Sequence, residues 1–571
     1  RAGGVAVPLC TLHPRPELEY TLADSAASVV VAHPRYASLV ERIYVLSGYA
    51  ALKFAADTRS EQSLNLRSRL RDAVAMLANR TLFFVLWWKE LDDEPATRLL
   101  AELADSPDRH HFLAELRRLR RFSLDEGSEQ AINLKNANGV DALVTLYSML
   151  TNRLEFRLTV EGEEKTLTRD EIQSYVYSPE PEVRRAAYHE LFRVFDGEAG
   201  VLGQIYTHRV LDWHNEYLTL RGYASPIAVR NLANDVPDRA VELLIETARE
   251  SAGLFRRYFR LKAGWIGHER LHRYDLYAPL AASRRTVPYA DAVAMVLDTL
   301  AGFHPRMAEL AERVLAEDHV DAEIRPGKKS GAFCATILPS QTPWLLINYT
   351  GRVRAVATLA HELGHAVHSL LAADHSVLTQ APSLPLAETS SVFAEMLLTD
   401  RLLAEESDPL ARRELLAASM DDIYATVMRQ AYFTRFEILA HQAVHEGRPP
   451  SALDEIYLET LREQFGDSVE LSDEFRREWI AIPHLFHTPF YCYSYSFGQL
   501  LVLSLYQRFR EQGEAFIPGY LRLLEYGGSA RPSRILAEVG VDVDDADFWR
   551  GGFRIVERMI DELESLGDTG L

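Results

Sequence analysis

The stretch VRAVATLAHELGHAVHSLL, residues 353–371, carries a strong helix signal and contains the pattern His-Glu-x-x-His at positions 361–365. Residues four apart share one face of a helix, so His361 and His365 can both reach one tetrahedral metal ion with bonds of about 2.0–2.1 Å. Glu362 is turned roughly 100° from His361 and can meet a metal-bound water. The alternative is a helix whose two histidines are satisfied in the core. The motif favours a helical fold organised around a zinc site.

A catalytic zinc site needs three protein ligands and keeps a fourth position for water. The metzincin class would require glycine at position 368 and histidine at 371, but the chain has His368 and Leu371, which excludes that class. Glu388 opens the next predicted helical stretch, and Glu395 follows seven residues later on the same helical face. We assign Glu388 as the third ligand and Glu395 as an acceptor for a ligand-histidine N–H, with the reverse assignment left open.

A second group of polar and aromatic residues is the segment HLFHTPFYCYSY, residues 484–495. Its alternating tyrosines are typical of a half-buried structural stretch. Peptide hydrolysis at zinc also builds negative charge on the former carbonyl oxygen, which a tyrosine O–H or a histidine N–H can stabilise. His484 and the tyrosines at 491, 493 and 495 are therefore candidates for that task.

Composition limits the class of partner. The chain has 571 residues, a net charge of −20 and 47% hydrophobic residues, which is an ordinary globular balance. The acidity argues against nucleic acid or an anionic membrane as the main partner. Three widely spaced cysteines form no disulfide framework, and the longest apolar stretch, residues 81–88, is too short to cross a bilayer. These features predict a cytoplasmic protein.

Most of the remaining sequence has helical periodicity, including one buried face that runs from residue 241 to residue 259. Residues 344–349 instead form a short apolar run between Pro343 and Gly351, which predicts a buried strand. This strand is a candidate to pair with an extended substrate by strand addition. Residues 5–7 and 29–31 have the β-branched character of short α/β-type strands.

These residues resemble the oligoendopeptidase F family, bacterial relatives of the thimet oligopeptidases, from about residue 49 to the C-terminus. The specific segments are GKKSGAF at 327–333, TLAHELGHAVH at 358–368, ETSSVFAE at 388–395, IPH at 482–484, FY at 490–491 and DFW at 547–549. The resemblance implies a mainly α, two-lobed body with a small β element near the zinc helix. It also implies a deep channel that admits short unstructured peptides and excludes folded proteins.

Residue by residue, the resemblance implies His361, His365 and Glu388 as ligands of one Zn²⁺ per chain and Glu362 as the catalytic base. His484 and Tyr491 match the family's substrate-side histidine and tyrosine. The thimet-like relatives have a glycine pair where this chain has Thr488-Pro489. The spacing therefore leaves open which of the tyrosines at 491, 493 and 495 stabilises the oxyanion.

The first forty or so residues resemble a fragment of an acyl-CoA synthetase instead, and the chain begins with Arg1. We expect a spliced or misassembled N-terminus in which the first helices of the peptidase are missing. The predicted domains are a foreign-looking α/β fragment at 1–42, an N-terminal helical region at 43–195 and a catalytic domain at 196–571.

The sequence thus predicts a zinc-dependent metalloendopeptidase that hydrolyses internal bonds of short oligopeptides with a zinc-bound water activated by Glu362. A zinc carboxypeptidase is one alternative, although no cationic anchor for a terminal carboxylate is identifiable. A peptide-binding protein that has lost catalysis is another, but a binder has no use for Glu362. Cobalt or manganese could replace zinc in such a site.

Overall fold

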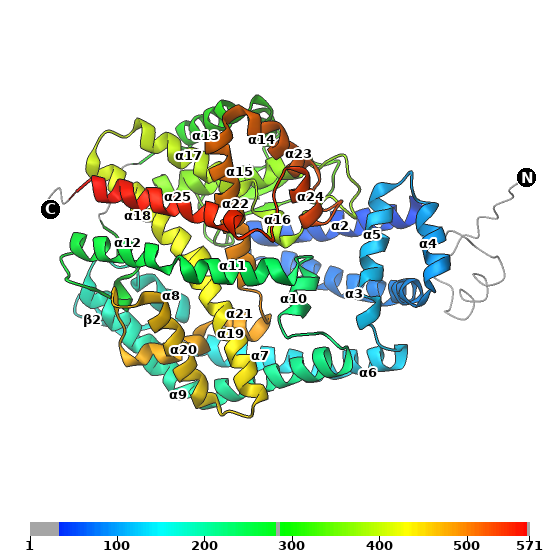
Figure 1. Cartoon of the computed structure of the whole chain (residues 1–571), viewed down its shortest axis with the longest axis horizontal. Helices are drawn as coiled ribbons and strands as arrows, with labels where there is room; N and C mark the ends of the chain where they lie inside the picture. Colours follow the sequence, from blue (N-terminus) through cyan, green and yellow to red (C-terminus); the bar gives the residue numbers. More distant parts are fainter. Residues whose placement is uncertain (1–33, 281–285, 568–571) are drawn as a thin grey trace, which may run out of the picture. The chain divides into compact units, whose positions relative to one another are not determined.

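The computed structural model describes residues 34–280 and 286–567, and these ranges are mainly helical (Figure 1). The predicted strands at 5–7 and 29–31 lie outside them. The described chain divides into two compact units. Unit 1 takes the described residues up to 126, then 287–382 and 521–531, and unit 2 takes the rest. The predicted mainly α fold with two parts and a small β element near the zinc-motif helix is confirmed, whereas the deep channel stays a prediction.

Unit 1 holds a group of helices and a three-stranded sheet. Its elements are α2 (Pro34–Ala56), α3 (Glu61–Glu90), α4 (Asp93–Ala101), α5 (Pro107–Arg118), η1 (Arg120–Phe122), α13 (Tyr289–Phe303), α14 (Pro305–Ala316), β4 (Val320–Asp321), β5 (Phe333–Ala335), β6 (Trp344–Leu346) and α15 (Val353–Leu371). Helix α2 runs without a break across residue 42, where a domain boundary was predicted. The domain boundaries themselves stay a prediction.

Helix α15 has the bounds that its sequence predicts. Its apolar residues are buried along one face, and they pack against α13, α14 and the sheet (Figure 1). The small residues Gly364 and Ala366 are also buried. This packing holds the His-Glu-x-x-His motif on a rigid element, as a metal site requires.

The sheet beside α15 has the strand order β4-β6-β5, with β4 parallel and β5 antiparallel to β6. The predicted buried strand is therefore present as β6. Because β6 is hydrogen-bonded on both sides, the predicted addition of a substrate strand along residues 344–346 is wrong. The backbone just beyond β6 is engaged too, since Ile347 and Tyr349 donate to the carbonyls of Asp321 and Ala322.

Unit 2 is larger. Its first part contains α6 (Glu126–Asn138), α7 (Val140–Asn152), β1 (Phe156–Val160), β2 (Glu163–Leu167), α8 (Arg169–Tyr175), α9 (Pro181–Trp213), η2 (His214–Leu220), α10 (Ala228–Ala233), α11 (Asp238–Glu250), α12 (Ala252–Trp265), β3 (Leu271–His272) and η3 (Arg273–Asp275). The helical face predicted from residue 241 is buried, but the helix is broken at Ser251, which separates α11 from α12.

The second part of unit 2 carries the remaining predicted site residues. It contains α16 (Leu384–Ala387), α17 (Ser391–Glu405), α18 (Pro409–Ile423), η4 (Tyr424–Met428), α19 (Arg429–His445), α20 (Pro450–Phe465), β7 (Val469–Glu470), η5 (Asp473–Ala481), α21 (Pro483–His487), α22 (Tyr493–Gln512), η6 (Gly513–Phe516), α24 (Pro532–Glu538) and α25 (Ala546–Ser565). Helix α23 (Ile517–Glu525) carries the chain from unit 2 into unit 1.

The core of unit 2 combines apolar packing with buried ion pairs. Helices α22 and α25 pack against each other, with Phe497 and Trp549 in edge contact at 4.9 Å between ring centroids. Arg273 is paired with Glu478 at 2.7 Å, and both are buried. Buried charges need such partners because desolvation is costly. Among residues 34–280 and 286–567, no helix is both long and apolar enough to cross a membrane.

Candidate metal centre

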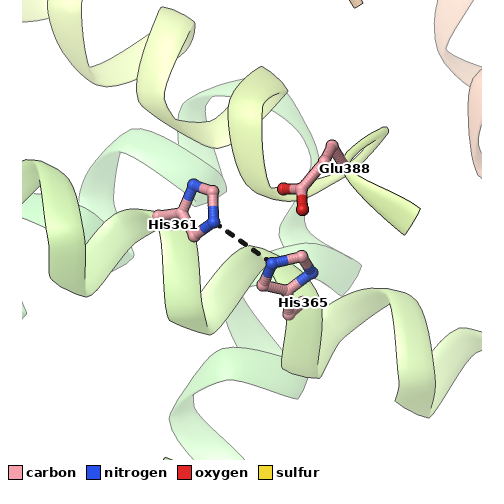
Figure 2. A group of neighbouring side chains, drawn as sticks. All are labelled: His361, His365 and Glu388. Carbon is pink, nitrogen blue, oxygen red and sulfur yellow. Dashed lines mark hydrogen bonds between the residues drawn. The ribbon is translucent and has the colours of Figure 1, made fainter. Parts of the chain in front are cut away.

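His361 and His365 lie on successive turns of α15 and are half-buried. Their Nε2 atoms are 3.1 Å apart, and their rings meet edge to face at 4.8 Å between centroids. Figure 2 shows both imidazoles rising from α15 toward the carboxylate of Glu388. The ligand atoms of the three residues all lie within 4.8 Å of one another, the one such group found among the described residues. The four-residue spacing therefore gives the convergence that the sequence predicts.

Glu388 reaches this position from a turn and not from the body of a helix. Helix α16 ends at Ala387, and α17 starts at Ser391, so the helix that the sequence predicts to open at Glu388 begins three residues later. The Ser391 hydroxyl donates to Glu388 Oε2 at 2.7 Å, which orients the carboxylate. Tyr520 anchors the turn as well, because its hydroxyl donates to the carbonyl of Thr389 at 2.9 Å.

The three side chains fit a zinc ion by their chemistry and spacing. Two imidazoles and one carboxylate, with a fourth position left for water, are the ligand set of many catalytic zinc sites. Tetrahedral bonds of about 2.0–2.1 Å place neighbouring donor atoms about 3.3 Å apart. The Nε2 atoms are already 3.1 Å apart, and small rotations would bring the carboxylate into range. His368 and Glu395 are not part of this group.

Glu362 is 5% exposed and lies beside the small sheet. Strand β5 packs on α15, and the Thr336 and Ser369 hydroxyls form a hydrogen bond of 2.6 Å next to that contact. Burial, followed by the negative charge of Glu362, raises the pKa of the Cys334 thiol. Cys334 is therefore a neutral neighbour of the carboxylate. Nothing in the sequence indicates that Cys334 lies near Glu362, because a lone cysteine in a short strand carries no recognisable pattern.

The second predicted group comes together as a cluster of three aromatic side chains. The ring of His484 stacks on Tyr491 at 5.7 Å with an interplanar angle of 7°, and it meets Tyr495 edge to face. Tyr491 and Tyr495 are themselves 5.3 Å apart, and the Tyr495 hydroxyl is 3.4 Å from His484 Nε2. Burial and then the charge of His487 lower the pKa of His484, which keeps this imidazole neutral at neutral pH.

Tyr493 and His487 lie apart from this cluster. Tyr493 is fully buried, and its hydroxyl accepts a hydrogen bond of 2.9 Å from the Asn234 amide. His487 Nε2 is 3.2 Å from the Ser148 hydroxyl on α7. Tyr493 therefore belongs to the core and His487 is turned toward α7, which leaves Tyr491 and Tyr495 as the tyrosines with accessible rings.

The start of α22 also lies next to Glu388. A Cβ atom at Gly498 would be 3.6 Å from Glu388 Cβ, an ordinary packing distance. The pKa of the Tyr495 hydroxyl is raised by burial first, then by Tyr491, and also by the charge of Glu388. The start of α22 therefore lies next to Glu388 and also supplies Tyr495 to the aromatic cluster, so both are in the same region of unit 2.

A helix bearing His-Glu-x-x-His, a carboxylate from a separate turn and nearby donor side chains together define a metallopeptidase site. The family model for Peptidase family M3 matches residues 174–555, and the chain belongs to this family. The protein is therefore a metalloendopeptidase, and the predicted likeness to oligoendopeptidase F is confirmed.

The relatives agree with this assignment over nearly the whole chain. The sequence is 26% identical to oligopeptidase PepF of Bacillus subtilis, with 95% of this chain and 82% of the relative covered. It is also 26% identical to chromosomal oligoendopeptidase F of Lactococcus lactis subsp. cremoris, covering 96% and 92% of the two chains. The aligned share of this chain, 95–96%, is larger than the share that follows residue 48. The likeness therefore begins before residue 49, earlier than predicted.

A solved structure has the same fold. Oligoendopeptidase F of Enterococcus faecium is 24% identical to this chain and superposes with a TM-score of 0.72, covering 93% of this chain and 92% of its own.

Proposed function

We propose that the chain is a zinc-dependent endopeptidase that hydrolyses internal bonds of short peptides. The convergence of His361, His365 and Glu388 within 4.8 Å, with Glu362 on the same helix, is the observation that carries the proposal. We assign the first three residues as ligands of one zinc ion per chain. The relatives from Bacillus subtilis and Lactococcus lactis are named as an oligopeptidase and an oligoendopeptidase, which supports peptides as the substrate class.

Glu362 is the general base of the proposed reaction. When bound, zinc supplies a Lewis acid that polarises the scissile carbonyl and lowers the pKa of a coordinated water. Glu362 lies next to His361 in the sequence but points about 100° away from it on the helix, so its carboxylate can face the water without being a ligand. It accepts the proton of the attacking water and delivers that proton to the leaving amine.

His484, Tyr491 and Tyr495 are the proposed donors to the oxygen that becomes negative during the attack. A neutral imidazole can donate one N–H, and a tyrosine hydroxyl can donate one O–H. The stacking of His484 on Tyr491 limits the orientations of both rings, which supports preorganisation of these donors. We assign His484 and Tyr491 as the catalytic pair, with Tyr495 as the second tyrosine of the cluster.

The test is cleavage of a quenched fluorescent peptide of about ten residues with both ends blocked. We expect cleavage at an internal bond, loss of activity on treatment with a chelator, and recovery after one equivalent of zinc per chain. A blocked C-terminus distinguishes this activity from that of a carboxypeptidase. Metal-loaded protein that cleaves no peptide would refute the proposed function.

The matched variant is Glu362→Gln, which keeps the shape of the side chain but cannot accept a proton. We expect full zinc content and a loss of turnover of about 10²–10⁴-fold. Unchanged turnover in the zinc-loaded variant would remove Glu362 from the mechanism.

A further inference from the structure

The segment that carries His484 and Tyr491 is held by side chains from three other helices of unit 2. Arg209 of α9 donates to the carbonyl of Phe486 at 3.1 Å, and Arg230 of α10 donates to the carbonyl of Pro489 at 3.3 Å. The third contact comes from α19, where Glu437 Oε1 accepts the backbone N–H of Phe490 at 2.9 Å. This last bond is buried and lies one residue before Tyr491.

Phe490 has an unusual backbone conformation. Its φ angle is +57°, in the left-handed region that residues with a side chain rarely adopt. The residue is 1% exposed, and its ring packs against His441 at 4.6 Å, one helical turn beyond Glu437 on α19. A left-handed aromatic residue persists only where its surroundings impose that conformation, and such residues cluster at functional sites. The described contacts that Phe490 itself makes with α19 are its hydrogen bond to Glu437 and its packing on His441.

The Glu437 side chain is fully buried, although an isolated buried carboxylate is costly. Burial raises its pKa to about 8, against the opposing effects of the Phe490 N–H and the charge of Arg230. The carboxyl is therefore mostly protonated at neutral pH. Within the described residues, its Oε2 atom has no hydrogen-bond partner, so the bond that Oε1 accepts from the Phe490 N–H is the hydrogen bond that holds this buried carboxyl.

We propose that Glu437 is a positioning residue, which holds Phe490 in its left-handed conformation and thereby sets Tyr491 against His484. The left-handed residue turns the chain between α21 and α22, so that the ring of Tyr491 stacks on His484 and contacts Tyr495. Without the buried acceptor, Phe490 would relax toward an ordinary conformation and move Tyr491. This inference rests on the proposed function in one respect: that function gives Tyr491 and His484 their role toward the substrate.

Three substitutions separate the position of the acceptor from its charge. Glu437→Gln keeps a carbonyl oxygen at the same distance and resembles the protonated carboxyl. Glu437→Asp keeps the carboxyl but withdraws it by about 1.5 Å, one carbon–carbon bond. Glu437→Met fills a similar volume and removes the acceptor. We expect the Gln variant to stay within about threefold of the wild-type kcat. The Asp and Met variants should lose about 10- to 100-fold in kcat, with KM and zinc content near wild type.

Thr434→Val is the matched control, because Thr434 is buried on the same helix and bonds only to the Gln430 carbonyl among the described contacts. It should lower the melting temperature without lowering kcat. An active Asp variant beside an inactive Gln variant would show that charge matters and would overturn the proposal. A Met variant with wild-type kcat would overturn it too, and if that variant does not fold, the Asp and Gln pair decides.

A crystal structure of the Asp variant tests the same point without any activity. We expect Phe490 to leave the left-handed region and the Tyr491 ring to leave His484. An unchanged φ at Phe490 and an unchanged ring stack would refute the positioning role. Because this readout needs no turnover, failure of the proposed peptidase activity in the wild type is detected separately and leaves the test intact.

Discussion

At the residue scale, Glu388 is the side chain whose loss should affect metal binding most directly. Its carboxylate completes the half-buried group with His361 and His365, and Ser391 orients it. We expect Glu388→Ala to lose zinc to a chelator, because two histidines seldom hold the ion alone. Glu395→Ala is the comparison variant and should weaken zinc binding less, because it removes only the assigned acceptor of a ligand-histidine N–H. Metal analysis checks both variants, and full zinc occupancy in Glu388→Ala would mean that another residue is the third ligand.

The three tyrosines of the second group should respond differently to loss of the hydroxyl. Tyr491→Phe should lower kcat more than it raises KM, since a donor that meets only the transition state contributes little to substrate binding. Tyr493→Phe should leave kcat unchanged and destabilise the fold by about 0.5–1.5 kcal/mol, because its hydroxyl accepts from Asn234. Steady-state kinetics and urea unfolding measure the two effects. A change in KM alone for Tyr491→Phe would make it a substrate-binding residue.

The buried Glu437 predicts a specific pH dependence of stability. Its pKa is about 8 in the folded protein against an ordinary value of 4.5, so between these pH values the folded state binds more protons than the unfolded chain. The free energy of unfolding therefore falls as pH rises through this window, by about 1.4 kcal/mol per pH unit from this group. The free energy of unfolding of the wild type minus that of Glu437→Gln, measured by urea unfolding from pH 5 to 8, should show this slope. A pH-independent difference would contradict it.

At the scale of elements, the connection after α15 is packed against a pair of glycines. A Cβ atom at Gly528 would lie 2.2 Å from the carbonyl oxygen of Ala381, and one at Gly527 would lie 2.3 Å from that of Gln380. The Gly528 N–H also donates to the Thr379 carbonyl at 2.8 Å. The close approach of two backbones explains why side chains are absent there.

Gly528→Ala should therefore destabilise the protein by about 1–3 kcal/mol, as overpacking typically does. Gly200→Ala is the control, because Gly200 lies in helix α9 with no atom within 4 Å of an added Cβ, and alanine should stabilise the helix slightly. Melting temperatures of the two variants provide the measurement. Equal stability of Gly528→Ala and wild type would show that the connection shifts without cost.

Helices were predictable where the periodic signal was long and unbroken. The bounds of α15 follow from its apolar spacing, and its packing on α13, α14 and the sheet confirms which face is buried. Breaks were missed where the apolar pattern continued through them. Ser251 interrupts one predicted helix. The helix predicted to open at Glu388 begins instead at Ser391, after a turn. A turn between two buried helices keeps its apolar residues, so periodicity alone does not reveal it.

At the scale of the whole molecule, the proposed preference for short peptides is the remaining testable property. We expect a peptide of about ten residues to be cleaved much faster than an unfolded protein such as reduced casein, because a channel would admit only short chains. Time courses with both substrates at equal concentrations of peptide bonds measure the ratio. Equal rates would refute a closed channel while leaving the chemistry of the site untouched.

The sequence by itself determined the helical class and the pairing of His361 with His365, because four-residue spacing on a helix is a local property of the chain. Tertiary structure decided the rest. The hydrogen bond between Glu437 and Phe490 joins distant segments, and no local pattern encodes such a contact.

The alternating tyrosines show most clearly what the local sequence determines and what the tertiary structure decides. In a strand, residues 491, 493 and 495 would share one face. The chain instead enters α22, where residues two apart point about 200° from each other, so Tyr493 turns to Asn234 in the core while Tyr495 turns to His484.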